Sequence, residues 1–446
     1  MKHSNIGRVI GLVLAFAVLP VVAQAQPPTP QDAALQRLLT EQARRLEALE
    51  AQLAALQAEV KSLRGQAGLP PAPGAAAAVP PVTDPEAEPP VQHAVGGGAP
   101  EDENDPKAPE ADLPTAAPIK AYGSLRLASV VNTDGVSDIR NNSSRVGLRG
   151  EKHLGGSLTA FARLELGVNL VNNDRTIIET GEPGAPIGQG SQAFFSRLGF
   201  IGLATPVGNV SWGKQWSPYY DVAEFTDQGQ LFSGLASGAF NAGTDGGLAG
   251  TGRAERSVQY RERFGLVSVG LQVQNRATSP NDRNWLDTWG GSVIVGRTQG
   301  FSASAGYNEV RDGVDNPNPN QVQLGDKAGI FGARYRRGGW YGAVVFSILK
   351  QHEVDDLGRR YDGKGFEAAF VGDVTDRTWV EVVFNNLQPD SDHPGDFRLR
   401  FLATNVVYRF GPASRVFAGV KFDGGRTSDG SSRPAAVFAG GLRFNF

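Results

Sequence analysis

The feature that most constrains this chain is a series of short segments, from residue 119 to its end, in which apolar and polar residues alternate. Sixteen such segments fit into these 328 residues. A period of two residues places successive side chains on opposite faces of a β-strand. The pattern therefore predicts sixteen strands, each with one apolar and one polar face.

The connections between the segments alternate between two kinds. Residues 153–156, 205–208 and 337–339 are tight turns that contain glycine, whereas GVDNPNPNQVQLGD and PDSDHPGD are long and polar. An even number of strands with short turns at one end and long loops at the other is typical of an outer-membrane barrel. A soluble sandwich shows neither this asymmetry nor so many strands. We predict an all-β fold, a 16-stranded antiparallel transmembrane β-barrel.

The third segment shows which face meets the lipid. Leu158, Leu164 and Leu166 lie on one face, and Arg163 and Glu165 lie on the other. In a lipid-embedded barrel the apolar face points outwards and the charged face lines the lumen. Sixteen strands enclose a circle too wide for side chains to fill, so we expect water in the lumen.

The last segment, FAGGLRFNF, alternates in the same way. Phe438, Leu442, Phe444 and Phe446 share its apolar face. We expect Phe446 at the periplasmic lipid interface, because an apolar chain end needs an apolar environment. Aromatic residues near strand ends predict girdles at the two interfaces: Trp212, Trp289, Trp340, Tyr341, Trp379 and Phe446.

The first 25 residues have the pattern of a secretory signal peptide. Basic residues precede the apolar run VIGLVLAFAVLPVV, and Ala23-Gln24-Ala25 forms a small-x-small cleavage site. The alternative, an uncleaved anchor, is disfavoured because the run is shorter than a spanning helix needs. The chain contains no cysteine, which excludes disulfides and thiolate metal sites.

Two regions separate the signal peptide from the strands. Residues 31–66 carry leucine and valine at alternating spacings of four and three, which predicts a periplasmic coiled coil; the alternative is a helix packed on its own domain. Residues 67–118 are rich in proline and alanine and predict a flexible, disordered linker. The charge is divided unevenly, with 35 basic and 32 acidic residues from 119 onwards.

Residues 119–446 resemble the general trimeric porins of Gram-negative bacteria. The matching stretches are SSRVGLRGEKHLGGSLTAFARLELG, SRLGFIGLATPVGNVSWGKQWSPYYDV, GRAERSVQYRERFGLVSVGLQVQ and the terminal Phe446. The resemblance implies a homotrimer in lipid and lipopolysaccharide, with a third loop folded into the lumen. It also implies a C-terminal signal for the barrel-assembly machinery, formed by Leu442, Phe444 and Phe446. The N-terminal coiled coil is similar to periplasmic extensions found in a subset of porins, some of them substrate-selective.

The candidate third loop spans residues 217–252, which is far longer than connections without a function. Its carboxylates predict the acidic side of a constriction: Asp221, Glu224, Asp227 and Asp245. The lumenal parity of the strands predicts the basic side: Arg126, Arg145, Arg149, Arg163, Arg197 and Arg261, joined by Lys214 if a bulge shifts its strand. A basic wall that faces an acidic loop produces a transverse field that orients dipolar solutes.

The surplus of lumenal arginine predicts a mild anion preference, since the guanidinium group suits carboxylate and phosphate. Three functions stay open: a passive diffusion porin, a selective channel for small anions such as dicarboxylates or phosphate, and a barrel that anchors a coiled-coil tether to peptidoglycan. No catalytic motif, cofactor site or nucleic-acid partner is indicated, because the five histidines lack metal-binding spacing and no nucleophile elbow is present.

Overall fold

The computed structural model describes residues 119–171, 193–240, 245–275, 284–311 and 326–446. Within these ranges the chain forms one sheet of seventeen strands and one short helix, α3 (Tyr220–Ala223). The strands are, in chain order, β1 (Ile119–Asn132), β2 (Ser137–Asn141), β3 (Arg145–Gly155), β4 (Leu158–Val168), β5 (Phe194–Thr205), β6 (Gly208–Trp216), β7 (Arg253–Phe264), β8 (Val267–Gln274), β9 (Thr288–Gly296), β10 (Gly300–Val310), β11 (Lys327–Arg337), β12 (Trp340–Val354), β13 (Arg360–Thr375), β14 (Thr378–Pro389), β15 (Leu399–Arg409), β16 (Ser414–Asp423) and β17 (Ala436–Asn445).

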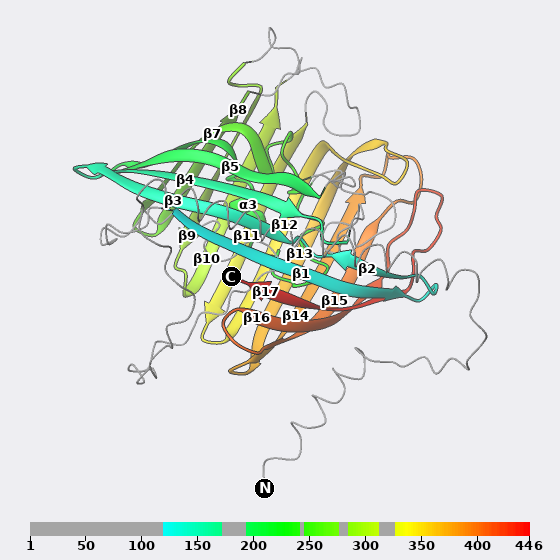
Figure 1. The fold of residues 1–446 in the computed structure, drawn as a ribbon. Coiled ribbons are helices and arrows are strands. Elements are labelled where there is room, and N and C mark those ends of the chain that lie inside the picture. The colour runs from blue at the N-terminus through cyan, green and yellow to red at the C-terminus, as the bar shows by residue number, and fades with distance from the viewer. Residues whose placement is uncertain (1–118, 172–192, 241–244, 276–283, 312–325) are drawn as a thin grey trace, which may run out of the picture. The chain divides into compact units, whose positions relative to one another are not determined.

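The sheet closes on itself, because the last strand pairs with the first. Strand β17 runs antiparallel to β1, with Leu127 opposite Leu442 (Figure 1). Strands β2 and β3 both pair with β1, one after the other along its length, so together they form a single barrel strand. The seventeen assigned strands therefore make a ring of sixteen, and the predicted 16-stranded antiparallel barrel is confirmed. Closure satisfies the backbone groups of every strand, as a hydrocarbon environment demands.

The sixteen predicted segments correspond to β1 and to β3 through β17. Strand β2 is the element that the sequence pattern missed. Its five residues follow a turn at Gly135 and precede the polar residues Asn142-Ser143-Ser144, where Ser143 adopts a positive φ of 59°. This break divides one barrel strand into two pieces and interrupts the alternation on which the prediction relied.

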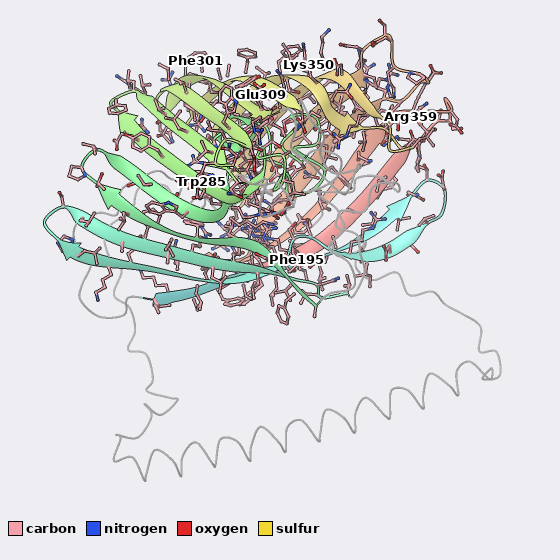
Figure 2. The ribbon with its side chains drawn as sticks, turned by 90° about the horizontal axis from the view of Figure 1, so that it is seen from above. Phe195, Trp285, Phe301, Glu309, Lys350 and Arg359 are labelled. Carbon is pink, nitrogen blue, oxygen red and sulfur yellow. The ribbon has the colours of Figure 1, made fainter. Side chains whose placement is uncertain are left out.

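The apolar faces of the strands point outwards and the charged faces point inwards, as predicted. On β17, Phe438, Leu442 and Phe444 are exposed on the outer surface, whereas Arg443 is buried on the inner side. Phe301 likewise points outwards from β10 (Figure 2). On β4, Leu164 is exposed and Glu165 is fully buried. An apolar exterior of this kind matches a lipid environment.

The signal peptide, the coiled coil and the linker predicted for residues 1–25, 31–66 and 67–118 lie outside the described residues. In the part of the chain that the structure describes, no helix is both long and apolar enough to cross a bilayer.

Candidate functional site

The long connection between β6 and β7, residues 217–252, turns into the barrel; its residues 217–240 and 245–252 are described. The base of this third loop is closed by two bonds from Ser217. Its backbone N–H donates to the Gly252 carbonyl at 2.9 Å, and its Oγ donates to the Thr251 carbonyl at 2.7 Å. The same Oγ accepts the Tyr220 N–H at 3.0 Å and so supports the first turn of helix α3.

The third loop carries its own apolar side chains. Val222, Phe225, Leu231 and Phe232 are each at most 1% exposed. They belong to one apolar core together with inward-facing residues of β12 to β16, which include Tyr341, Val345, Val383, Phe401 and Phe417. The inner face of these strands therefore carries large apolar side chains, among which lie a few buried polar ones such as Glu367 and Glu381. Apolar loop residues would otherwise contact lumenal water, so this half of the wall forms a docking surface for the loop.

Buried carboxylates on the same half of the wall hold the loop backbone. Glu367 on β13 accepts the Ala236 N–H at 2.6 Å and contacts the Thr226 hydroxyl. Glu381 on β14 accepts the Gln230 N–H at 2.6 Å. These bonds satisfy backbone donors in a segment that has no sheet partner of its own, and they fix the loop across the lumen.

Two residues expected in the aromatic girdles face inwards instead. Tyr341 and Trp379 are 3% and 1% exposed. The Tyr341 hydroxyl donates to the Phe225 carbonyl of the third loop at 2.6 Å, and Trp379 Nε1 donates to Glu381 at 2.8 Å. The girdle prediction is wrong for these two, because the inner wall needs large side chains there to pack against the loop. Trp212, Trp289, Trp340 and Phe446 are exposed on the outer face.

Asp221, in helix α3, contacts the basic wall directly. Its carboxylate pairs with the Arg261 guanidinium of β7. Burial raises the pKa of Asp221 above its ordinary value, although Arg261 and the Ser292 hydroxyl favour the charged form. Arg261 also donates to the Trp216 carbonyl at 2.8 Å and thereby ties the start of the loop to β7.

Asp245, near the end of the loop, lies between two cations. Lys214 Nζ is 2.7 Å from its carboxylate, and Arg253 Nε is 3.5 Å away. Burial raises the pKa of Asp245. The positive charges of Arg253 and Lys214 lower this pKa by more than burial raises it, so the pKa of Asp245 is below its ordinary value. The β6–β7 register shifts between Gly213 and Gln215, but the extra residue of the shift lies in β7. Ser211 and Gln215 of β6 are both buried, with Ser211 Oγ donating to Gln215 Oε1 at 2.6 Å, so the alternation of β6 is unbroken and the shift does not reverse the face of Lys214.

The other two loop carboxylates have different environments. Asp227 is buried and accepts bonds from the Tyr220 hydroxyl at 2.7 Å and the Ser233 hydroxyl at 2.6 Å, so it shapes the loop from within. Glu224 directly follows helix α3 as its C-cap, is partly exposed and interacts electrostatically with Tyr341.

Opposite the docking surface, three arginines surround one carboxylate. Glu165 of β4 accepts a bond from Arg197 Nε through its Oε1 at 2.7 Å, and its Oε2 lies 3.5 Å from Arg163 Nη2. The negative charge of Glu165 also attracts Arg145. Arg163 Nε donates to the Tyr122 hydroxyl at 2.8 Å. In Figure 2, nitrogen atoms gather on the inner side of this part of the wall. Three guanidinium groups against one carboxylate leave a net positive charge at the lumen.

Arg126 and Arg149 also lie on the inner face. Arg126 of β1 is 1% exposed, and its Nε donates to Ser124 Oγ at 2.8 Å. Arg149 of β3 is exposed and pairs in register with Arg163. The sequence prediction omitted Arg253, which begins β7, is 2% exposed and has its Nε 3.5 Å from Asp245. Parity counted back from Arg261 does not identify it, because the register shift in β7 falls between the two residues.

The chain end is bound to the first strand. The backbone of Phe446 exchanges two bonds with Gly123, at 2.8 and 3.0 Å. The Phe446 ring covers Gly123 so closely that a Cβ there would lie 2.3 Å from the ring. Phe444 stacks beside Phe446 with ring centroids 6.2 Å apart, and Leu442 is exposed on the same face.

A family model described as Gram-negative porin matches residues 115–428. The chain belongs to this family. Among curated relatives, outer membrane porin F of Salmonella typhimurium is 29% identical over 266 residues, which are 58% of this chain and 64% of that protein. Outer membrane porin C of Rahnella aquatilis is 27% identical over 262 residues, 53% of this chain and 70% of that protein. The chain thus spans slightly less than two thirds of the porin F relative.

Solved structures show the same fold. Salmonella typhi OmpF in complex with daunomycin has a TM-score of 0.59 at 19% identity and covers 74% of this chain and 97% of its own. The trimer form of OmpT from Vibrio cholerae has a TM-score of 0.52 at 16% identity, with 74% and 99% covered. An anion-selective porin from Comamonas acidovorans has a TM-score of 0.53 at 17% identity, again with 74% and 99% covered. The family and the fold place the barrel in the outer membrane.

Among the described residues no group of histidines or carboxylates could hold a metal ion.

Proposed function

We propose that this porin forms a water-filled channel for passive diffusion of small hydrophilic solutes, with a mild preference for anions. The observation that carries the anion preference is the group of Arg145, Arg163 and Arg197 around the single carboxylate of Glu165. Lumenal charge of one sign concentrates solutes of the opposite sign and rejects those of the same sign. The third loop supports the proposal, because it runs away from these arginines and docks on the apolar side chains of β12 to β16 on the opposite wall.

The constriction in this proposal lies between the third loop and the arginine wall. Asp221 and Asp245 hold the two ends of the loop against Arg261, Lys214 and Arg253. Glu224 and Asp227 contribute negative charge in the same loop. A transverse field between loop and wall aligns dipolar solutes and disfavours long apolar ones.

Liposome swelling tests the channel with neutral sugars of increasing size and with matched anionic and cationic solutes. We expect rates that fall steeply with solute size and are higher for anions than for cations of equal size. The Arg197→Gln variant should reduce the difference between anions and cations, because one of the three guanidinium groups loses its charge. Folded protein that produces no swelling would contradict the channel, and an unchanged ion preference in Arg197→Gln would contradict its assignment to this wall.

We also infer a homotrimer, which the trimer form of Vibrio cholerae OmpT supports. The terminal Leu442, Phe444 and Phe446 are proposed as the signal for the barrel-assembly machinery, which their exposure on the outer face supports. Chemical cross-linking in native membranes tests the trimer, and the expected product has three times the mass of the mature chain.

A further inference from the structure

Strand β12 contains a bulge beside the third loop. The β12–β13 register shifts between Leu349 and Glu353, so that three residues of β12 lie opposite a single residue of β13. Within the bulge Gln351 adopts a positive φ of 50°, a conformation that residues with a side chain rarely adopt. Bulges redirect side chains, and strained backbone is concentrated at sites that have a function. The side chain that this bulge turns inwards is that of its last residue, His352.

Bonds from β13 hold the strained backbone of the bulge in place. The backbone N–H and the Nε2 of Gln351 both donate to Asp362 Oδ1, at 3.0 and 2.9 Å, and Arg360 Nη1 donates to the Gln351 carbonyl at 2.7 Å. His352 is 0% exposed, whereas its neighbours Lys350 and Gln351 are exposed. The bulge thus fixes the His352 ring on the lumenal side of β12, against the third loop.

Both ring nitrogens of His352 face oxygen atoms that accept hydrogen bonds. Nδ1 is 2.5 Å from Asp326 Oδ1, and Nε2 is 2.6 Å from the Gly238 carbonyl of the third loop. An ionised carboxylate and a carbonyl can only accept, whereas a neutral imidazole has one N–H and one lone pair. Only the imidazolium ion donates at both nitrogens, so this geometry is satisfied when the ring carries the additional proton.

The third loop packs closely on the His352 ring. Gly238 is buried with a φ of 79°, and a Cβ added there would lie 3.2 Å from His352 Cδ2 and 2.7 Å from Leu349 Cδ2. A neutral ring that gives its single N–H to Asp326 turns a lone pair towards the Gly238 carbonyl. Two facing lone pairs repel each other, and a buried carbonyl without a donor is costly. Loss of the ring proton therefore weakens the hold on the loop.

The charged groups around the ring favour its protonated form. Asp326 directly precedes β11, Glu353 follows His352 on β12, and both acids interact electrostatically with the ring. One or both of these acids also interact with groups of β13 and of the third loop, namely Arg360, Tyr361 and Tyr219. Two carboxylates against one guanidinium group leave a negative field at the ring, and a negative field stabilises an imidazolium ion.

We propose that His352 is a proton-dependent latch, which holds the third loop against β12 while its ring is protonated and releases the loop as the pH rises and the ring loses its proton. The latch is complete at low and neutral pH and is lost at alkaline pH, because only the imidazolium form makes both bonds. Release frees the loop near Gly238 to move in the lumen. This inference adds a response to pH to the proposed channel and rests on that channel only for its electrical measurement.

Single-channel current noise of the full chain, recorded in a planar bilayer over a pH series, tests the latch. The noise should be low at neutral pH and rise with a midpoint above about 6.5, the ordinary pKa of histidine, because Asp326 stabilises the proton. Asp326→Asn should move this midpoint down by about 1–3 pH units, since it removes the paired charge. His352→Gln should abolish the transition. The matched control is His153→Gln, at an exposed position near the end of β3, which should leave the transition unchanged.

Noise that stays constant over the pH series, a transition that persists in His352→Gln, or a midpoint that does not move in Asp326→Asn would overturn the latch while the channel stands. Nitrogen NMR of histidine-labelled protein in detergent measures the same proton without conductance, with the signal assigned by its loss in His352→Gln. We expect both ring nitrogens to be protonated at neutral pH, and a ring with a single N–H would overturn the latch. This measurement needs only the original fold and Asp326→Asn if His352→Gln fails to fold, because the midpoint of the assigned shift must then move between these two proteins.

Discussion

Gly365 on β13 offers the sharpest test of how the third loop is held. A Cβ added at this position would lie 1.7 Å from the Ala236 carbonyl oxygen of the loop and 2.4 Å from Ser347 Oγ. Ordinary contacts begin at 3.4 Å. The loop backbone must therefore move by roughly 1.5 Å to accept a single methyl group, since the barrel strand is fixed on both sides by its ladder.

The free-energy cost of Gly365→Ala follows from the bonds that this movement strains. Ser347 Oγ donates to the Ala236 carbonyl at 3.0 Å, and the Ala236 N–H donates to Glu367 at 2.6 Å. A neutral bond contributes about 1 kcal/mol and a bond to a charged group about 1.5–3 kcal/mol. Gly365→Ala should weaken docking of the loop by about 2–4 kcal/mol.

Single-channel recording measures the consequence. A loop displaced from β13 moves into the lumen, so we expect a lower mean conductance and more current noise for Gly365→Ala. The control is Gly342→Ala on β12, where an added Cβ meets no atom within 4 Å and the channel should conduct normally. A Gly365→Ala channel with the original conductance and noise would refute the docking argument.

Three further outcomes follow from the structure. The low pKa of Asp245 means that its contribution to loop docking is complete above its ordinary pKa of 3.8 and is lost only as the pH falls further, so in a pH series the difference in current noise between Asp245→Asn and the original protein should stay constant down to about that pH. Lys214→Gln should increase the current noise, because Asp245 at the end of the third loop loses its ion pair with Lys214 Nζ at 2.7 Å. Gly123→Val should displace the Phe446 ring at a cost of about 1–3 kcal/mol and lower the yield of heat-resistant barrel on gels, whereas Gly411→Val, which has open space, should not.

Much of the barrel could be predicted from the sequence because strand parity is a local property. Alternation alone located sixteen barrel strands, placed Glu165 inside and placed Leu164 outside. The same argument left Lys214 conditional on a bulge, because a bulge leaves no certain mark in the residue pattern, and the register shift that the structure shows there has its extra residue in β7.

The partners of the third loop could not be predicted in this way. Glu367 binds Ala236 and Glu381 binds Gln230 across 131 and 151 residues of sequence. Such pairs arise only when the barrel closes and the loop folds inwards. Tyr341 and Trp379 were misplaced for the same reason, since an aromatic residue near a strand end suits a lipid interface until an apolar loop is known to lie behind it.

The alignment of inward-facing arginines on neighbouring strands shows a different limit. Parity assigns Arg415 and Arg443 to the inner face, but their alignment with Arg126 depends on the register of two strand pairs. Register follows from how the whole ring closes, so a side chain on β1 meets one near the chain end only in the folded barrel.

The most direct test of the account is the reversal potential of single channels in a planar bilayer under a gradient of potassium chloride. A water-filled lumen with three arginines around Glu165 predicts discrete conductance steps and a reversal potential displaced towards that of chloride. A correctly folded barrel that gives no steps, or steps with a reversal potential displaced towards that of potassium, would contradict it.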